Sequence, residues 1–265
     1  MSRPTERRLA AAPMCTVPAG TFRRGSGLAP DEGPVADVAM SAFAMDRDPV
    51  SNGQFARFIE DGGYRTAAYW TPAGWEFVRV RGITAPTYWD DPLWAGDPEV
   101  PVTGVSWWEA LAFARWAGRT LPTEAQWEYA CRGPAGRTYP WGEDPPEPAL
   151  ATYAPGCEPE ERRPTRPGDH PRNVSPFGVR DMAGNFAEWC LDTYGPYGDG
   201  PVGPDPVRMT DESADHVVRG GCGLHDEDYL RGSARDYYHP GLRDNLIGFR
   251  CALPRESGTG KGEAT

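Results

Sequence analysis

The sequence of 265 residues has no apolar run of the ~18 residues that a membrane-spanning helix needs. Its opening stretch MSRPTERRLAAAPM contains arginines but no apolar segment long enough for a secretory signal peptide. The six cysteines form no CxxC pair and have no regular spacing, which argues against a zinc site and against a disulfide framework. These absences predict a cytoplasmic protein whose cysteines are mostly reduced and buried.

The sequence also has an excess of negative charge. Lys and Arg number 27 against 38 Asp and Glu, which gives a formal net charge of −11. Such a charge repels phosphate backbones and anionic lipid headgroups. We therefore expect no nucleic-acid partner and no membrane partner, and the charge favours cationic ligands or divalent metal ions. The oligomeric state stays open.

Glycine, proline and tryptophan are abundant. The chain has 32 Gly, 29 Pro and 10 Trp, which indicates a loop-rich body in which large rings supply much of the packing. The proline-rich stretches 134–171 and 195–206 are predicted to be irregular. Irregular connections of this length are uncommon in compact domains. A bound metal ion is one way to hold them in place.

Three short helices are indicated by their first residues. Ser51 is a good N-cap, Ser106 and Glu109 match a capping box, and Thr123 with Gln126 matches a second one. Apolar residues follow each start at helical spacing, and glycines follow each end. Strands are predicted at Ala36–Phe43, His216–Arg219 and Gly248–Leu253.

A series of motifs resembles the formylglycine-generating enzyme family, which also includes the C-terminal domains of sulfoxide synthases. The resemblance implies an α+β fold in a single domain, related to C-type lectins and poor in regular secondary structure, over residues 15–254. Residues 1–14 are then a flexible N-terminal segment and residues 255–265 a disordered tail. The motifs are VPAGTFRRGS (17–26), DPVSNGQFARFI (48–59), LPTEAQWEYA (121–130), FGVRDMAGNFAEW (177–189), VVRGG (217–221) and IGFRCA (247–252).

Residues 61–89 look closer to the sulfoxide-synthase branch than to the sulfatase activators. Synthases of that branch place their iron-binding histidines on an added N-terminal helical bundle. This sequence starts at the lectin-like domain and contains no HxxxHxE motif. We therefore do not expect the iron site of that branch.

The segment DMAGNFAEW matches the calcium ligands of the family at Asp181, Gly184, Phe186 and Glu188. Calcium prefers several oxygen ligands, and this loop offers two carboxylates with two backbone carbonyls between them. The resemblance thus implies a structural Ca²⁺ ion, while a solvated acidic turn is the alternative. A second family calcium site is expected to be lost, because the asparagine expected near Thr152 is missing.

The segment RGGCGLHDED, which starts at Arg219, replaces the copper-binding cysteine pair of formylglycine-generating enzymes. Neither cysteine of that pair is present, and Cys222 aligns with a serine. We therefore do not expect oxidation of a sulfatase cysteine. Cys222 is either a small buried residue or a ligand or nucleophile of the pocket. A two-histidine, one-carboxylate Fe²⁺ triad could be drawn from this loop, although such a run is more often a solvated acidic face. Its possible donors are His225, Asp226, Glu227, Asp228 and His239.

Two functions remain open. The first is a metal-dependent oxidoreductase that uses Fe²⁺ or Cu⁺ and acts on a small molecule or peptide in bacterial biosynthesis or modification. The second is a noncatalytic lectin-like module that binds a peptide, protein or small ligand. Arg235 and Arg250 are also candidates for structural ion pairs, and the tyrosines of these loops could be pocket walls or ordinary packing. The predicted catalytic pocket consists of Trp189, Cys222, His225, Tyr229, Arg235 and His239.

Overall fold

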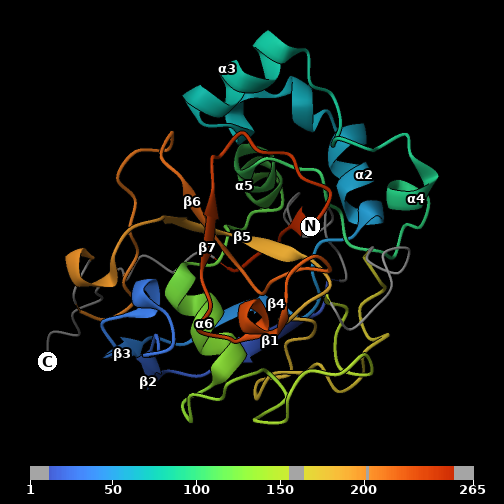
Figure 1. Cartoon of the computed structure of the whole chain (residues 1–265). Coiled ribbons are helices and arrows are strands. Elements are labelled where there is room, and N and C mark those ends of the chain that lie inside the picture. Colours follow the sequence, from blue (N-terminus) through green and yellow to red (C-terminus); the bar gives the residue numbers. More distant parts are fainter. Residues whose placement is uncertain (1–11, 155–163, 201–202, 254–265) are drawn as a thin grey trace, which may run out of the picture.

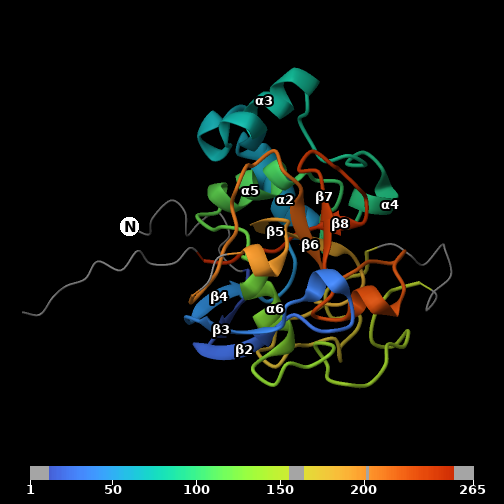
Figure 2. The same cartoon turned by 60° about the vertical axis from the view of Figure 1, so that its left-hand side comes forward.

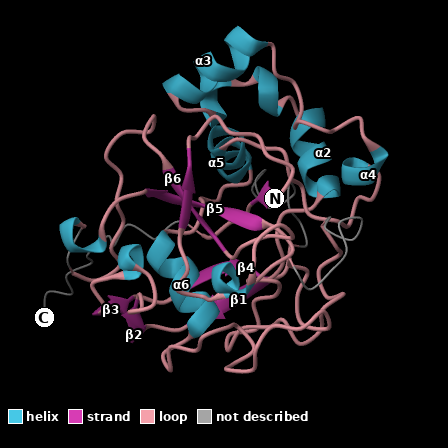
Figure 3. Ribbon diagram, viewed as in Figure 1, coloured by secondary structure: helices cyan, strands magenta, loops and turns pink. Residues whose placement is uncertain are grey.

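The computed structural model describes residues 12–154, 164–200 and 203–253. Loops and turns make up most of the described chain, as Figure 3 shows. The α-helices are α2 (Asn52–Glu60), α3 (Pro72–Arg81), α4 (Pro92–Ala95), α5 (Trp107–Trp116) and α6 (Glu124–Arg132). The strands are β1 (Met14–Val17), β2 (Gly20–Arg24), β3 (Ala36–Met40), β4 (Phe43–Asp46), β5 (Ala187–Thr193), β6 (His216–Arg219), β7 (Asp236–Tyr238) and β8 (Ile247–Gly248).

The central element is a four-stranded sheet with the order β7-β6-β5-β8. Its pairs are antiparallel except β5 with β8, and Glu188 lies opposite Arg219 in the β5–β6 pair. Two separate antiparallel pairs, β1–β4 and β2–β3, lie below this sheet in Figures 1 and 2. In both views α5 lies above the central sheet and α6 below it.

The sheet separates two apolar cores because successive strand residues point to opposite faces. Trp189 and Val218 belong to the core around α5, whereas Cys190 and Val217 belong to the core around α6. Nine of the ten residues of α5 are buried, so this helix is apolar on nearly all sides. The protein is therefore a single α+β domain, as expected.

The three predicted helix starts are confirmed. Ser51, Ser106 and Thr123 each accept a hydrogen bond from the backbone of the third helical residue, and that residue's side chain returns the bond in each case. These capping boxes fix helix entry through contacts only three residues apart. The local sequence is therefore sufficient to place α2, α5 and α6.

The predicted strands were only partly right. The strand at His216–Arg219 is confirmed as β6, but Ala36–Phe43 is two strands that belong to different pairs. Of Gly248–Leu253 only Gly248 lies in a strand, and Ala252 forms isolated bridges. Residues 1–14 and 255–265 were expected to be flexible, and of these 1–11 and 255–265 lie outside the described residues. Strand β1 already begins at Met14. No described helix has the length and apolar character required to cross a bilayer.

Candidate active site

The candidate site is built on the chain that leaves β6. Gly220 and Gly221 have φ values of 98° and 67°, a region that side chains strain to adopt. A Cβ atom on Gly221 would lie 2.9 Å from the carbonyl oxygen of Tyr229, and one on Gly220 would lie 3.2 Å from the Trp127 ring. The double glycine therefore lets the 222–230 loop fold back against its own start.

Cys222 and His225 face each other across a tight turn. The Cys222 sulfur lies 3.6 Å from Nδ1 of His225, and the His225 amide donates to the Cys222 carbonyl at 2.9 Å. The imidazole also stacks on the Tyr229 ring at 4.3 Å between centroids. Burial raises the pKa of the Cys222 thiol to about 11 and lowers the pKa of His225. At neutral pH the pair is therefore a neutral thiol beside a neutral imidazole.

Asp236 and Tyr238, on β7, complete this group. An Asp236 carboxylate oxygen lies 3.8 Å from Nε2 of His225, and the Tyr238 hydroxyl donates to the same oxygen at 2.8 Å. Burial, with help from Asp236, raises the pKa of Tyr238, so its hydroxyl keeps its proton. Asp236 was not among the predicted site residues, because the pairing of β7 with β6 that brings it to the loop is a long-range contact.

A narrow recess lies beside His225. It lies next to the imidazole, the Tyr229 ring and the Asp236 carboxylate, and it is too small to admit a water molecule. Tyr229 is 40% exposed and Tyr237 44% exposed, so aromatic rings are open to solvent on this part of the surface. The lining consists of Ala187, Val218, Arg219, Gly220, Gly221, His225, Tyr229, Ala234, Arg235 and Asp236.

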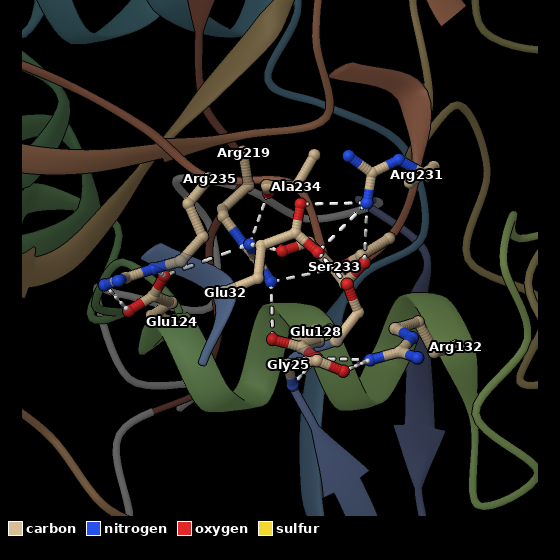
Figure 4. A network of polar contacts seen from close by, with 12 residues as sticks. Gly25, Glu32, Glu124, Glu128, Arg132, Arg219, Arg231, Ser233, Ala234 and Arg235 are labelled. Atoms are coloured by element: carbon tan, nitrogen blue, oxygen red, sulfur yellow. Dashed lines mark hydrogen bonds and ion pairs between the residues drawn. The ribbon is translucent and has the colours of Figure 1, made fainter. Parts of the chain in front are cut away.

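Buried ion pairs fix the base of the site, as Figure 4 shows. Arg219 donates to Glu128 at 2.6 Å, and Arg235 donates to both oxygens of Glu124 at 2.6 and 3.0 Å. Arg231 donates to Glu32 at 2.8 Å. These contacts tie the 231–235 segment to α6 and to the η1 turn (Pro30–Glu32).

The Arg235 side chain is part of this network of ion pairs. Besides Glu124, its guanidinium lies over the rings of Tyr194 and Tyr197, at 4.7 and 4.0 Å from their centroids. The structure therefore gives it the ion pair that the sequence suggested. Arg250 forms the other expected ion pair, with Glu188 at 2.6 Å.

Three residues of the predicted pocket, Cys222, Trp189 and His239, do not line the recess. Trp189 is fully buried in the α5 core, where its indole NH donates to the Val105 carbonyl at 3.0 Å. The His239 ring lies near Trp108, and its Nδ1 accepts from the Gly241 amide at 3.1 Å. Within the described residues, no three His, Cys, Asp or Glu side chains gather in a way that could hold a metal ion.

The loop expected to bind calcium is largely buried and has one unusual feature. Oδ1 of Asp181 is buried without a hydrogen-bond partner, while Oδ2 accepts from the Gly168 amide at 3.3 Å. Burial raises the pKa of Asp181 to about 7. Glu188 differs, because its carboxylate accepts two bonds from Arg250 and one from the Trp127 indole at 2.9 Å.

Gly184 and Phe186 lie on the same loop between these carboxylates. Gly184 has a φ of 73° and donates its amide to the Gly220 carbonyl at 2.7 Å, which joins this loop to the double glycine. Phe186 is buried. Asp181 therefore has a buried carboxylate oxygen without a partner, whereas Glu188 already has a positive partner.

Comparison with known proteins agrees with this fold and loop arrangement. Residues 2–255 match the family described as the sulfatase-modifying factor enzyme 1-like domain, and the chain belongs to this family. It is 34% identical over 284 residues to the formylglycine-generating enzyme of Thermomonospora curvata, with coverage of 90% of this chain and 92% of that protein.

The chain is also 36% identical over 240 residues to hercynine oxygenase of Mycolicibacterium thermoresistibile. That match covers 84% of this chain but 53% of the relative, so the chain spans about half the length of the hercynine oxygenase. The solved structure of PvdO from Pseudomonas aeruginosa has a TM-score of 0.72 at 23% identity, with coverage of 90% and 93%. This last likeness shows the fold alone.

Proposed function

We propose that the chain is a metal-dependent oxidoreductase whose reactive group is the Cys222–His225 pair. The observation that carries this proposal is the 3.6 Å approach of the buried Cys222 sulfur to Nδ1 of His225, the one of the two residues that lines the recess. Relatives named hercynine oxygenase and formylglycine-generating enzyme support an oxidative reaction. The substrate we propose is a small molecule or peptide that contacts the exposed Tyr229 ring, which stacks on His225.

The donor types fit a soft or borderline ion. A thiolate with an imidazole suits Cu⁺ best, and Fe²⁺ is the second candidate. Such an ion would supply the one-electron chemistry with oxygen that neither side chain can perform alone. The five described cysteines are free thiols, which supports a reducing, cytoplasmic setting for the site.

The chain's own residues would prepare this site. Burial keeps the thiol of Cys222 protonated in the absence of an ion, so ion binding must release that proton. His225 is held by stacking on Tyr229 and offers a nitrogen lone pair without first losing a proton. The charge of Arg235 is neutralised by Glu124, so Arg235 would position the 231–235 segment and would not bind the substrate.

Metal titration tests the proposal. Cu⁺ and Fe²⁺ are added under anaerobic conditions to the wild type and to a Cys222→Ala, His225→Ala double variant. We expect the wild type to bind one equivalent that the double variant does not bind. Cys15→Ala is the control, because Cys15 is a partly exposed thiol elsewhere, on β1. Equal binding by wild type and double variant would contradict the proposal and favour a noncatalytic binding module.

A His239→Ala variant separates two versions of the metal site. His239 would have to move from its place beside Trp108 to join His225 in an iron triad. Unchanged metal affinity in His239→Ala supports the Cys222–His225 site. A loss of Fe²⁺ binding would instead support the two-histidine site.

We also propose that a structural Ca²⁺ ion binds at Asp181, with the backbone carbonyls of Gly184 and Phe186 as further ligands. The unpartnered buried Oδ1 of Asp181 supports this proposal, since a buried charge without a partner is costly. Glu188 would contribute only by sharing its carboxylate with Arg250.

A further inference from the structure

Asp236 has a carboxylate that is held from two sides. Its Oδ1 accepts from the backbone amide of Tyr237 at 2.8 Å, and its Oδ2 accepts from the Tyr238 hydroxyl at 2.8 Å. It is the first residue of β7 and lies opposite Val218 of β6. The sheet therefore fixes its backbone while two donors fix its side chain.

The held carboxylate faces one particular nitrogen of His225. Oδ2 lies 3.8 Å from Nε2, whereas Nδ1 on the other side of the ring faces the Cys222 sulfur at 3.6 Å. An ionised carboxylate can only accept hydrogen bonds, so a lone pair on Nε2 would face another lone pair. Electrostatics therefore favours the imidazole proton on Nε2 and leaves the Nδ1 lone pair directed at sulfur.

We propose that Asp236 is a positioning residue that fixes His225 in its Nε2–H tautomer and thereby presets Nδ1 and the Cys222 sulfur as a donor pair for one soft metal ion. Metal–sulfur and metal–nitrogen bonds of about 2.3 and 2.0 Å can both be made across such a gap. Tyr238 contributes by holding the carboxylate. The metal part of this inference rests on the proposed function, whereas the tautomer does not.

The other acidic residues of the 226–228 loop have different roles. Asp226 accepts from the Asp228 amide at 3.1 Å, which caps the short η6 helix (Glu227–Leu230). Asp228 lies 3.7 Å from Arg231. Glu227 is exposed. Glu227→Gln is therefore a matched control, because it removes one negative charge from an exposed position of the same loop.

The first test reads the tautomer without any metal. The protein is labelled with ¹⁵N at histidine, and the two ring nitrogens of His225 are assigned by NMR at about pH 8, above the usual histidine pKa. We expect Nε2 to carry the proton in the wild type and in Glu227→Gln. In Asp236→Asn we expect the Nδ1–H form to appear, since the amide group can donate to Nε2.

The second test reads metal affinity. Cu⁺ is partitioned between the metal-free protein and a chromogenic copper chelator. Loss of an outer-shell partner lowers metal affinity by about 10–100-fold, which we expect for Asp236→Asn. Tyr238→Phe should give a smaller loss in the same direction, and Glu227→Gln none. Thermal melting of each variant confirms that it is folded.

The outcomes separate this inference from the proposed function. A wild type with its proton on Nδ1, or a tautomer that Asp236→Asn leaves unchanged, would overturn the inference. A changed tautomer with unchanged Cu⁺ affinity would overturn its metal part. If the tautomer responds as expected but the wild type binds no Cu⁺, the positioning role of Asp236 stands and the proposed metal site fails.

Discussion

Arg219 and Glu128 form an ion pair at 2.6 Å in which both side chains are fully buried. Glu128 lies on α6 and Arg219 is the last residue of β6, so this pair joins the helix to the strand that leads into the candidate site. Glu128 also accepts hydrogen bonds from the Gly25 amide, from Arg132 and from the Tyr197 hydroxyl. Every partner of this carboxylate is a donor.

The first prediction concerns that carboxylate. Glu128→Gln should lower the free energy of unfolding by about 3–5 kcal/mol, because it removes the 2.6 Å partner of the buried Arg219 guanidinium and leaves Glu124, at 3.9 Å, as the remaining carboxylate. Chemical denaturation measures the loss. Glu147→Gln is the control, since the Glu147–Arg172 pair is more than half exposed and should matter by less than about 0.5 kcal/mol. Similar losses in the two variants would contradict the prediction.

The second prediction concerns acid stability. His216 is buried against Trp107 at 3.7 Å between ring centroids, and burial lowers its pKa to about 4 from an ordinary value of 6.5. The unfolded chain therefore takes up a proton before the folded protein does. The stability that His216 provides is present above pH ~6.5 and is lost as pH falls toward ~4, by about 3 kcal/mol in total.

His216→Phe isolates this effect, because phenylalanine can stack on Trp107 but cannot be protonated. The free energy of unfolding, measured by urea denaturation across that pH range, should fall less steeply in the variant than in the wild type. Parallel curves would show that His216 does not contribute to acid sensitivity.

The third prediction concerns calcium. A chelator should lower the melting temperature of the wild type, because an ion bound only to the folded state stabilises it by about 2.7 kcal/mol at a hundredfold excess over its dissociation constant. Asp181→Asn should remove the difference between chelator and added Ca²⁺.

Glu188→Ala is a less specific test of the same site. It removes the partner of Arg250 and should destabilise the protein with or without calcium. If neither the chelator nor added Ca²⁺ changes the melting temperature of the wild type, the proposed calcium site is wrong.

The fourth prediction concerns the double glycine. Gly221→Ala should cost more stability than Gly82→Ala, although both residues have positive φ values, of 67° and 64°. A Cβ on Gly82 meets nothing within 4 Å, so only the backbone strain of about 1–2 kcal/mol applies there. A Cβ atom on Gly221 would lie 2.9 Å from the Tyr229 carbonyl oxygen, so the loop must move in Gly221→Ala. This movement should also lower the Cu⁺ affinity. Denaturation and copper titration compare the two variants, and equal stability losses would count against this packing.

The sequence was sufficient to predict those parts of the structure that depend on residues close together in the chain. Ser106 with Glu109 and Thr123 with Gln126 are three residues apart, so their capping boxes can be recognised without knowing the fold. Helix α3 also has local signals, with Thr71 as its N-cap and Gly82 at its end. The candidate pair Cys222–His225 was likewise visible, because one turn brings the two residues together.

The sequence was insufficient where a role depends on pairing across the chain. Asp236 faces His225 only because β7 pairs with β6, and three residues are too short to show a strand pattern. Trp189 was assigned to the pocket because it is close in sequence to the tyrosines of these loops, but its place on β5 directs it into the core around α5. The partner of Glu188, Arg250, lies 62 residues further along the chain.

All four side chains of the candidate reactive group, Cys222, His225, Asp236 and Tyr238, come from the single stretch that runs from the end of β6 through β7. The capped helices and both apolar cores are built almost entirely from other parts of the chain. The stretch is nevertheless anchored to the scaffold by the ion pairs of Arg231 with Glu32 and of Arg235 with Glu124. A transplant of this stretch into another member of the family would therefore need both acidic partners in the host.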